Sequence, residues 1–578
     1  MLERTVTIER ADILIVGGGC SGLSAALTAK ECDAGLDILV VDKACASKGW
    51  AGKAARTAGL LSFVSQEKDP EAFAKYCLEE IGFGLNDQHL LREFAYNSRR
   101  IVEHLSNWGV EIERNPDGTM AVGVWPFPWV TAGVDPDMCR CMAKTAKEYG
   151  VRFQDRIVIT RLLTDRGRIR GACGFHMNTG EFYVFYANAV ILACGSQNFD
   201  ITPSWCSTGV SQKLAYDAGC RLRNVEFCGM GDFGRIGPDG QYYYGQHSGA
   251  HTGHDWLFAG EENISQKWRP GFHSSMDPYA ANAWYQETMA GNGPIEVHME
   301  KFTEESGELF HFHPRARKRM HRVEEIAGYP HDHEWYEVFP GFISEMSAIR
   351  VGHNMETDLL GLLAVGDAAG AGSARAGAVP APPAKIHGTG LMNALFMGTK
   401  GGQAAALIAK YAGAAQTDLF SEEELRKLRN ETFTCLNRAE GISPYTVIHR
   451  VQDAMAPCDY TFIKSEARMK EALAIVEEAA EMLSKMKATD YHELSKCVDA
   501  EAMVLCARLF FLTSMERKES RGFHLREDYL EQSGEFACWL TVHKGENGPC
   551  ICREEIPVTG YDYPTSGMYE KEHMCNEL

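Results

Sequence analysis

The most constraining feature of this sequence is a set of spaced glycines near its start. Gly17, Gly19 and Gly22 form a GxGxxG pattern. The residues before them, 11–16, are mostly apolar and rich in β-branched residues, which is typical of a short buried strand, and a helix is expected over about 21–30. A glycine turn between a strand and a helix predicts a site where the backbone closely approaches a phosphate.

A second apolar run, 38–41, ends in Asp42 and completes a βαβ unit. In a dinucleotide-binding unit the first glycine permits the tight turn, the second admits the pyrophosphate, and the third lets helix and strand pack closely. Asp42 is then placed to accept hydrogen bonds from ribose hydroxyls. A second match, Gly229, Gly231 and Gly234, is rejected because the glycines and proline after it disfavour a helix. The motif alone leaves FAD and NAD open.

The rest of the chain divides by pattern. Further strands are expected at 151–153, 157–160, 169–175, 183–186, 189–193 and 361–365, with a hairpin turn at Asn178–Gly180. Beyond about Phe227 the sequence becomes irregular up to Pro340, which indicates an inserted lid domain. A long helix is expected over about 390–411, and helical periodicity dominates 421–516.

Composition excludes several classes of function. A formal net charge of −20 disfavours nucleic acid and anionic membranes as partners. The 19 cysteines contain no CxxC pair; for the CxC pairs at 139/141 and 550/552 packing is favoured over a metal or redox role, so no metal site is predicted. The polar start and the lack of a 20-residue apolar span predict no membrane span and a cytoplasmic protein with reduced cysteines.

Five separated segments carry a resemblance to a known family. They are Val16–Gly22, Ala189–Gly195, Ser207–Gly219, Gly361–Asp367 and Glu519–Tyr529. In these segments the sequence resembles the flavoprotein subunits of the fumarate reductase and succinate dehydrogenase family, and in places the alpha subunit of adenylylsulfate reductase. The resemblance implies FAD rather than NAD as the cofactor.

The resemblance also implies an α/β fold. We expect a discontinuous Rossmann-type FAD-binding domain with an inserted α+β capping domain, followed by a helical domain and a C-terminal extension. The predicted divisions are 1–235 and 341–412 for the FAD-binding domain, 236–340 for the capping domain, 413–516 for the helical domain and 517–578 for the C-terminal segment.

The resemblance assigns FAD contacts residue by residue. The residues predicted to bind FAD are Gly17, Gly19, Cys20, Ser21, Gly22, Asp42, Lys43, Ser47, Gly52, Ile157, Val158, Ala193, Cys194, Gly195, Gly366, Asp367, Gly390, Leu391 and Asn393. Gly390 and Leu391 begin a helix whose positive end would face flavin N1 and O2. In covalent members a histidine near 47–53 attaches the flavin, and this stretch has none, so FAD is expected to be noncovalent.

Departures from the family bear on the substrate. The segments 387–395 and 226–232 lack the arginine and the histidine that would hold a dicarboxylate, so fumarate and succinate are expected to be poor substrates. His387 is the predicted proton donor or orienter, with a structural histidine as the alternative. Arg375 is the predicted replacement for the missing arginine, with a solvated surface residue as the alternative. Weaker candidates are His353, Arg350 and Tyr336.

The functional hypothesis is an FAD-dependent oxidoreductase that transfers a hydride or electron pair between flavin N5 and a small polar substrate. The chain has no convincing second nicotinamide site and no CxxCxxC spacing, so electrons are expected to need an external carrier, with a direct reaction with free NADH or oxygen as the alternative. The resemblance supplies a ferredoxin-like iron–sulfur subunit, and hence a hetero-oligomer. The alternatives are adenylylsulfate reductase-like sulfur chemistry and an electron-transfer subunit with no small substrate of its own.

Overall fold

The fold is taken from a computed structural model of the chain. The structure describes residues 6–57, 59–124, 128–201, 207–236, 242–243, 257–268, 278–298, 314–315, 335–345, 348–370, 389–412 and 419–556.

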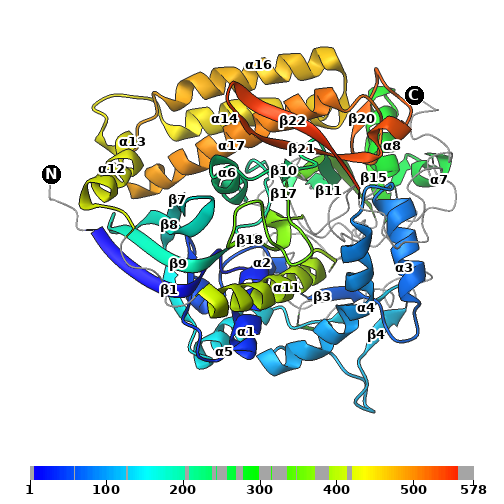
Figure 1. Cartoon of the computed structure of the whole chain (residues 1–578). Helices are drawn as coiled ribbons and strands as arrows, with labels where there is room; N and C mark the ends of the chain where they lie inside the picture. Colours follow the sequence, from blue (N-terminus) through cyan, green and yellow to red (C-terminus); the bar gives the residue numbers. More distant parts are fainter. Residues whose placement is uncertain are drawn as a thin grey trace.

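A seven-stranded sheet lies at the centre of the N-terminal region (Figure 1). Its strands, in spatial order, are β6 (Arg152–Asp155), β2 (Ile38–Asp42), β1 (Val6–Val16), β9 (Phe182–Leu192), β8 (Arg168–His176) and β7 (Ile157–Asp165), with β18 (Leu362–Ala364) also paired to β9. The strands β6, β2, β1, β9 and β18 run parallel, and β7 and β8 form an antiparallel meander with β9. The late strand β18 thus completes a sheet begun by the first residues, as expected for a discontinuous α/β fold.

The long strand β9 corrects one prediction. Two strands were expected, at 183–186 and 189–193, but the structure has one continuous strand of 11 residues. Neither glycine nor proline interrupts it, and β1 pairs with it from Val6 to Val16, so both halves find ladder partners. The predicted turn between β8 and β9 is confirmed, because these two strands pair antiparallel.

Two helices far apart in sequence pack together on this sheet. They are α1 (Cys20–Cys32) and α11 (Thr389–Ala412), with α5 (Met138–Glu148) beside α1. A Cβ at Gly398 would lie 2.5 Å from Ser21 O, and one at Gly402 would lie 2.4 Å from Ala25 O. The Ser24 hydroxyl also donates to Leu395 O at 3.1 Å. The glycines of α11 therefore allow it to lie directly against α1 (Figure 1).

A smaller antiparallel sheet is the described part of the inserted region. Its order is β12 (Tyr242–Tyr243), β11 (Cys228–Ile236), β16 (Trp335–Glu345), β15 (Ile295–His298), β13 (Leu257–Ala259) and β14 (Glu262–Asn263), with helices α7 (Ile264–Trp268) and α8 (Pro278–Met289). This is the expected α+β insertion. The rejected glycine pattern at 229–234 lies inside β11, which pairs with β16, and so does not form a strand-to-helix turn. The divisions at 236 and 340 stay predictions.

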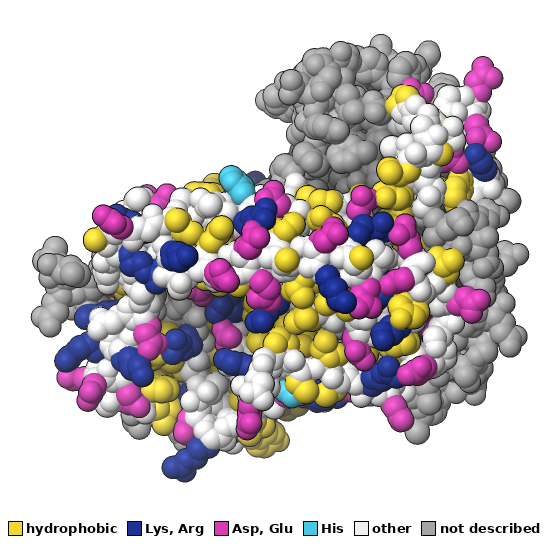
Figure 2. Space-filling model, turned by 90° about the horizontal axis from the view of Figure 1, so that it is seen from above, with side chains coloured by type: hydrophobic (Ala, Val, Ile, Leu, Met, Phe, Trp, Pro, Cys, Tyr) yellow, Lys and Arg dark blue, Asp and Glu magenta, His cyan; other side chains and the backbone are white. Residues whose placement is uncertain are grey.

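The region 421–516 is mainly helical, as expected, and forms the upper layer in Figure 1. Its helices are α12 (Glu422–Thr432), α13 (Thr434–Asn437), α14 (Pro444–Met455), α15 (Cys458–Thr461), α16 (Glu466–Leu483) and α17 (Tyr491–Glu516). Figure 2 looks onto this layer, where basic and acidic side chains are interspersed rather than segregated. Pairs such as Arg450 with Glu478, at 2.6 Å, belong to this mixed surface.

The C-terminal hairpin joins a third sheet. The strands β21 (Cys538–Gly545) and β22 (Gly548–Glu555) follow β17 (Ala348–Ile349) and β10 (Leu222–Arg223) in the order β17-β10-β21-β22. The short strands β19 (Ile463–Lys464) and β20 (Leu525–Arg526) pair with each other. Among the described helices, none is long and apolar enough to cross a membrane.

A last group of elements was not predicted from the sequence patterns. It consists of α2 (Ala54–Thr57), β3 (Leu60–Phe63), α3 (Pro70–Tyr76), α4 (Gln88–His104), β4 (Val122–Val124), β5 (Val130–Gly133) and α6 (Val210–Asp217). The helix α4 packs against α11 through Phe94 and Phe396, whose ring centroids are 5.5 Å apart.

Candidate cofactor site

The first and third glycines of the N-terminal turn are required by the packing of the chain itself. Gly17 has φ +107°, and a Cβ there would lie 2.5 Å from Ala193 O. A Cβ at Gly22 would lie 2.0 Å from Gly17 O. Any side chain at either position would collide with backbone, so these two glycines fix the tight passage from β1 into α1.

The second glycine is different. Gly19 has φ −73°, and the nearest atom to a Cβ built there is Gly52 Cα, at 3.6 Å. The protein's own atoms would therefore tolerate a side chain at Gly19. Gly19 is also the N-cap of α1 and offers no side chain to cap the first turn. The start of α1 is thus a cradle of helix N–H groups with room for a further atom beside Gly19, which suits a pyrophosphate.

The carboxylate of Asp42 lies beside this cradle. Its Oδ2 accepts the Gly18 N–H at 2.7 Å, and its Oδ1 accepts the Ala44 N–H at 2.6 Å. Burial raises the pKa of Asp42, although these two hydrogen bonds act to lower it. Each oxygen keeps a second lone pair, so the carboxylate can still accept hydrogen bonds from ribose hydroxyls.

Several predicted contacts follow the carboxyl ends of adjacent parallel strands. Gly17 follows β1, Asp42 ends β2, Gly195 comes soon after β9, and Gly366 comes soon after β18. Gly366 has φ +63°, and a Cβ there would lie 2.5 Å from the Ser21 hydroxyl. Ligands of open parallel sheets bind at this edge. The structure therefore brings together segments that are up to 349 residues apart, counted from 17 to 366.

Lys53 connects two of these segments. Its Nζ donates to Ser196 Oγ at 3.1 Å and lies 3.5 Å from Asp367 Oδ2. Asp367 was predicted as an FAD contact, whereas Lys53 and Ser196 were missed. The only sequence signal for Lys53 was its place in the stretch 47–53, which was considered for its lack of histidine.

The start of α11 supplies a buried amide. Asn393 Nδ2 donates to Gly370 O at 3.3 Å. Its Oδ1 is buried and accepts no hydrogen bond from the residues that the structure describes. Gly390 and Leu391 lie half-buried in the first turn of the same helix. An unsatisfied buried acceptor is costly without a partner, so Asn393 fits a ligand that donates a hydrogen bond.

Other predicted contacts have protein partners. The Ser47 N–H donates to Asp155 Oδ1 at 2.9 Å, and its hydroxyl also binds this carboxylate. Cys194 Sγ lies 3.3 Å from Val16 O, and burial raises the pKa of this thiol to about 11. The side chains of Ile157 and Val158 are buried in the apolar cores at the start of β7. Cys20 and Ala193 are buried beside the glycine turn, and Gly52 is exposed next to Gly19.

Lys43 extends from the site to the helical region. Its Nζ lies 3.3 Å from Asp499 Oδ1 on α17, and the Thr208 hydroxyl donates to the same oxygen at 2.7 Å. Burial acts to raise the pKa of Asp499, but Lys43, Lys496 and Thr208 together hold it below its usual value. Asp499 therefore anchors α17 to the loop after Asp42, a contact that the sequence patterns did not indicate.

The two predicted catalytic residues lie outside the part of the chain that the structure describes. His387 and Arg375 lie outside the described residues, as does the whole of 371–388. Of the weaker candidates, His353 Nε2 lies 3.7 Å from Asp87 Oδ1, and this carboxylate raises the pKa of His353. Arg350 binds Glu554 at 2.7 Å, and Tyr336 belongs to β16.

Comparison with known proteins agrees with this geometry. Residues 12–250 match the family model for an FAD binding domain, and residues 449–563 match the model for the fumarate reductase flavoprotein C-terminus. A fumarate reductase flavoprotein subunit from Haemophilus influenzae is 24% identical over 558 residues, covering 90% of this chain and 90% of that protein. The chain therefore contains an FAD binding domain and a fumarate reductase flavoprotein C-terminal domain, and it is similar to fumarate reductase flavoprotein subunits over most of its length. It is an FAD-dependent oxidoreductase, and FAD is its cofactor.

Other similar proteins also match over nearly the whole length of this chain. An uncharacterized FAD-dependent oxidoreductase from Methanocaldococcus jannaschii is 24% identical and covers 91% of this chain and 95% of its own. The fold resembles Escherichia coli quinol fumarate reductase, with a TM-score of 0.81, 19% identity and coverage of 97% of this chain and 99% of that one. It also resembles adenylylsulfate reductase from Archaeoglobus fulgidus, with a TM-score of 0.78, 20% identity and coverage of 97% and 98%. At these identities the structures establish the fold alone.

Proposed function

We propose that this flavoprotein transfers a hydride or electron pair between flavin N5 and a small polar substrate, and exchanges electrons with an iron–sulfur partner. The observation that carries the FAD-site part of this proposal is the convergence of Gly17, Asp42, Gly195 and Gly366 at the carboxyl ends of adjacent parallel strands. When bound, FAD supplies the two-electron chemistry.

The residues of this chain then have separate binding roles. The N–H groups at the start of α1 hold the pyrophosphate, with Gly19 leaving room for it, and Asp42 accepts the ribose hydroxyls. Lys53 and Asp367 form a polar pair beside the carboxyl ends of the parallel strands. This pair would orient the part of FAD between its pyrophosphate and its flavin ring. The positive end of α11 and the Asn393 amide bind the flavin ring. His387 and Arg375 remain the proposed substrate residues.

We further propose that FAD is held noncovalently. The stretch 47–53 has no histidine, and the Ser47 hydroxyl in it already forms a hydrogen bond with Asp155. The purified protein should carry about one FAD per chain and release it on acid or heat denaturation. Flavin absorbance that stays with the precipitated protein would contradict this proposal.

The iron–sulfur partner is proposed from the lack of an internal electron route. No CxxCxxC spacing occurs in the sequence, and relatives such as the flavoprotein subunit of fumarate reductase are named as subunits. The protein isolated from its native source should retain bound iron and labile sulfide. If it is isolated alone, and free NADH reduces its flavin at a catalytic rate, the partner proposal fails.

The proposed substrate is not a C4 dicarboxylate. The segments 387–395 and 226–232 lack the arginine and histidine that hold two carboxylates in the family. Turnover of fumarate or succinate at tens per second would contradict this proposal. His387→Ala should lower turnover of the true substrate while the flavin spectrum stays unchanged. If no small substrate is found and the flavin accepts electrons only from a protein, the chain is an electron-transfer subunit.

We also propose that the protein is located in the reducing cytoplasm. The free thiols of the described cysteines fit this location.

A further inference from the structure

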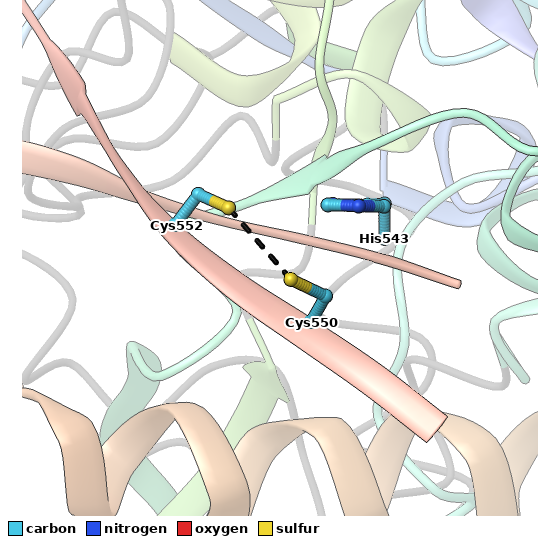
Figure 3. A group of neighbouring side chains, drawn as sticks. All are labelled: His543, Cys550 and Cys552. Carbon is cyan, nitrogen blue, oxygen red and sulfur yellow. Dashed lines mark hydrogen bonds between the residues drawn. The ribbon is translucent and has the colours of Figure 1, made fainter. Parts of the chain in front are cut away.

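The C-terminal hairpin places three metal-ligating side chains on one face. His543 lies on β21, directly opposite Cys550 on β22. Cys552 lies two residues further along β22, so the alternation of side chains puts it on the same face as Cys550. One ligand atom from each residue lies within 4.8 Å of the others. Figure 3 shows the two sulfur atoms and the imidazole gathered at the edge strand.

The distances fit a tetrahedral thiolate site. The two sulfur atoms are 3.9 Å apart. Two thiolates that each lie about 2.3 Å from one tetrahedral zinc ion are separated by roughly 3.8 Å. The sulfurs are therefore already at the spacing that a shared ion requires, and an imidazole nitrogen of His543 lies within 4.8 Å of both.

The histidine gives a second and independent indication. His543 Nδ1 is buried and has no hydrogen-bond partner among the described residues. A buried imidazole nitrogen usually binds a hydrogen-bonding group or a metal ion. The two cysteines, in contrast, are exposed, so an ion can reach the site from solvent.

A disulfide between the two cysteines fits less well. Alternate residues of an extended strand have Cα atoms about 6.7 Å apart, at the upper limit for a disulfide. Closing the sulfurs to about 2.05 Å would also distort β22, which pairs with β21 over its whole length. A metal ion requires neither change.

We propose that His543, Cys550 and Cys552 form a zinc site that fastens the edge strand β22 to β21, with water at the fourth position. Thiolate and imidazole ligands select zinc over hard cations such as Mg²⁺ and Ca²⁺. The site departs from the sequence prediction that the 550/552 pair serves packing. It is independent of the flavin chemistry proposed above, because it needs no electron transfer.

The test uses the full-length FAD-loaded protein, reduced and freed of metal with a chelator, and zinc sulfate as the probe. Zinc binding is measured by competition with a chromophoric chelator. The wild-type chain should bind one equivalent that the Cys550→Ser/Cys552→Ser variant lacks, and His543→Gln should weaken binding at least about tenfold. Cys32→Ser is the matched control, because Cys32 is an exposed thiol on a distant helix. It should bind zinc as the wild type does.

A second measurement needs no variant. Zinc should slow iodoacetamide modification of Cys550 and Cys552 at least about tenfold in the wild-type chain, because a ligated thiolate is shielded, while Cys32 reacts at the same rate with or without zinc. Equal zinc binding by the wild type and the double variant would overturn the proposal. So would unprotected cysteines, or a Cys550–Cys552 disulfide that persists in reductant.

Discussion

The glycine turn, residues 17–22, and a buried charge network that joins Glu226 to residues 464–524 achieve order by opposite means. The turn keeps its shape because Gly17 and Gly22 have no side chains that could collide with backbone. The network, formed by Glu226, Lys464, Arg517, Glu519, Arg521 and His524, packs buried acidic and basic side chains against one another. The comparison teaches that one region tolerates no added atom, whereas the other depends on the Glu519 carboxylate that its buried arginines share.

The carboxylate of Glu519 is central to the charge network. It accepts a hydrogen bond from Arg517 Nη1 at 2.7 Å. It also accepts hydrogen bonds from Arg521, whose Nε donates to Oε1 at 2.7 Å and whose Nη2 donates to Oε2 at 2.8 Å. All three side chains are fully buried. Burial acts to raise the pKa of Glu519, but the two guanidinium groups hold it below its usual value. Arg517 also binds Glu226 at 2.6 Å, and burial raises the pKa of that second carboxyl group.

The largest expected effect comes from removing the Glu519 charge. Glu519→Gln replaces the carboxylate shared by two buried arginines with a neutral amide, while Arg517 keeps Glu226, so the free energy of unfolding should fall by about 3–5 kcal/mol. Urea denaturation followed by circular dichroism measures this change. Glu535→Gln is the control: it breaks an exposed pair with Arg553 and should cost less than about 1 kcal/mol. Equal losses in the two variants would show that burial does not matter to the network.

Lys464 makes the network sensitive to pH. Its Nζ donates to Glu226 O at 2.7 Å and to Ser514 Oγ at 3.1 Å, and it lies 3.0 Å from His524 Nδ1. Burial lowers the pKa of Lys464 to about 7. It also lowers the pKa of His524 well below its usual range. The neutral His524 donates from Nε2 to Arg517 O at 3.0 Å, which leaves Nδ1 to accept from Lys464.

The second prediction follows from this shift. Between about pH 7 and the ordinary lysine pKa, the unfolded chain binds a proton that the folded chain lacks, so stability rises with pH in this window. From pH 7.5 to 9 Lys464 should contribute roughly 2 kcal/mol to the rise. Urea midpoints of the wild type and Lys464→Met at both pH values measure this contribution, with Lys470→Met on the exposed face of α16 as the control. If all three proteins show the same pH dependence, Lys464 keeps an ordinary pKa.

The sequence predicted the glycine turn far better than the charge network. Gly17, Gly19, Gly22 and Asp42 lie within one βαβ unit, so their spacing alone reveals their contacts. The network joins Glu226 to Arg517 across 291 residues, and no local period indicates such a pair. The segment 519–529 was noticed only through family resemblance. The Lys43–Asp499 and Lys53–Asp367 pairs were missed for the same reason, since long-range ion pairs leave no pattern in the chain.

A smaller loss of stability is expected when the third glycine of the turn is replaced. Gly22→Ala would place a Cβ 2.0 Å from Gly17 O, so it should lower the free energy of unfolding by about 1–3 kcal/mol and lose FAD through the distorted turn. Gly534→Ala, in open space on the surface, is the control and should change neither property. A Gly22→Ala protein with unchanged stability would contradict the steric account of this turn.

The most direct test of the cofactor site is the FAD affinity of Gly19→Ala. Its Cβ would lie 3.6 Å from Gly52 Cα and 4.0 Å from Ala51 O, which are ordinary contacts, so the apoprotein should denature as the wild type does. The added methyl group would occupy the cradle proposed for the pyrophosphate, so the dissociation constant for FAD, measured by quenching of flavin fluorescence, should rise at least about tenfold. A Gly19→Ala protein that folds normally and binds FAD as tightly as the wild type would contradict the placement of the cofactor on this turn.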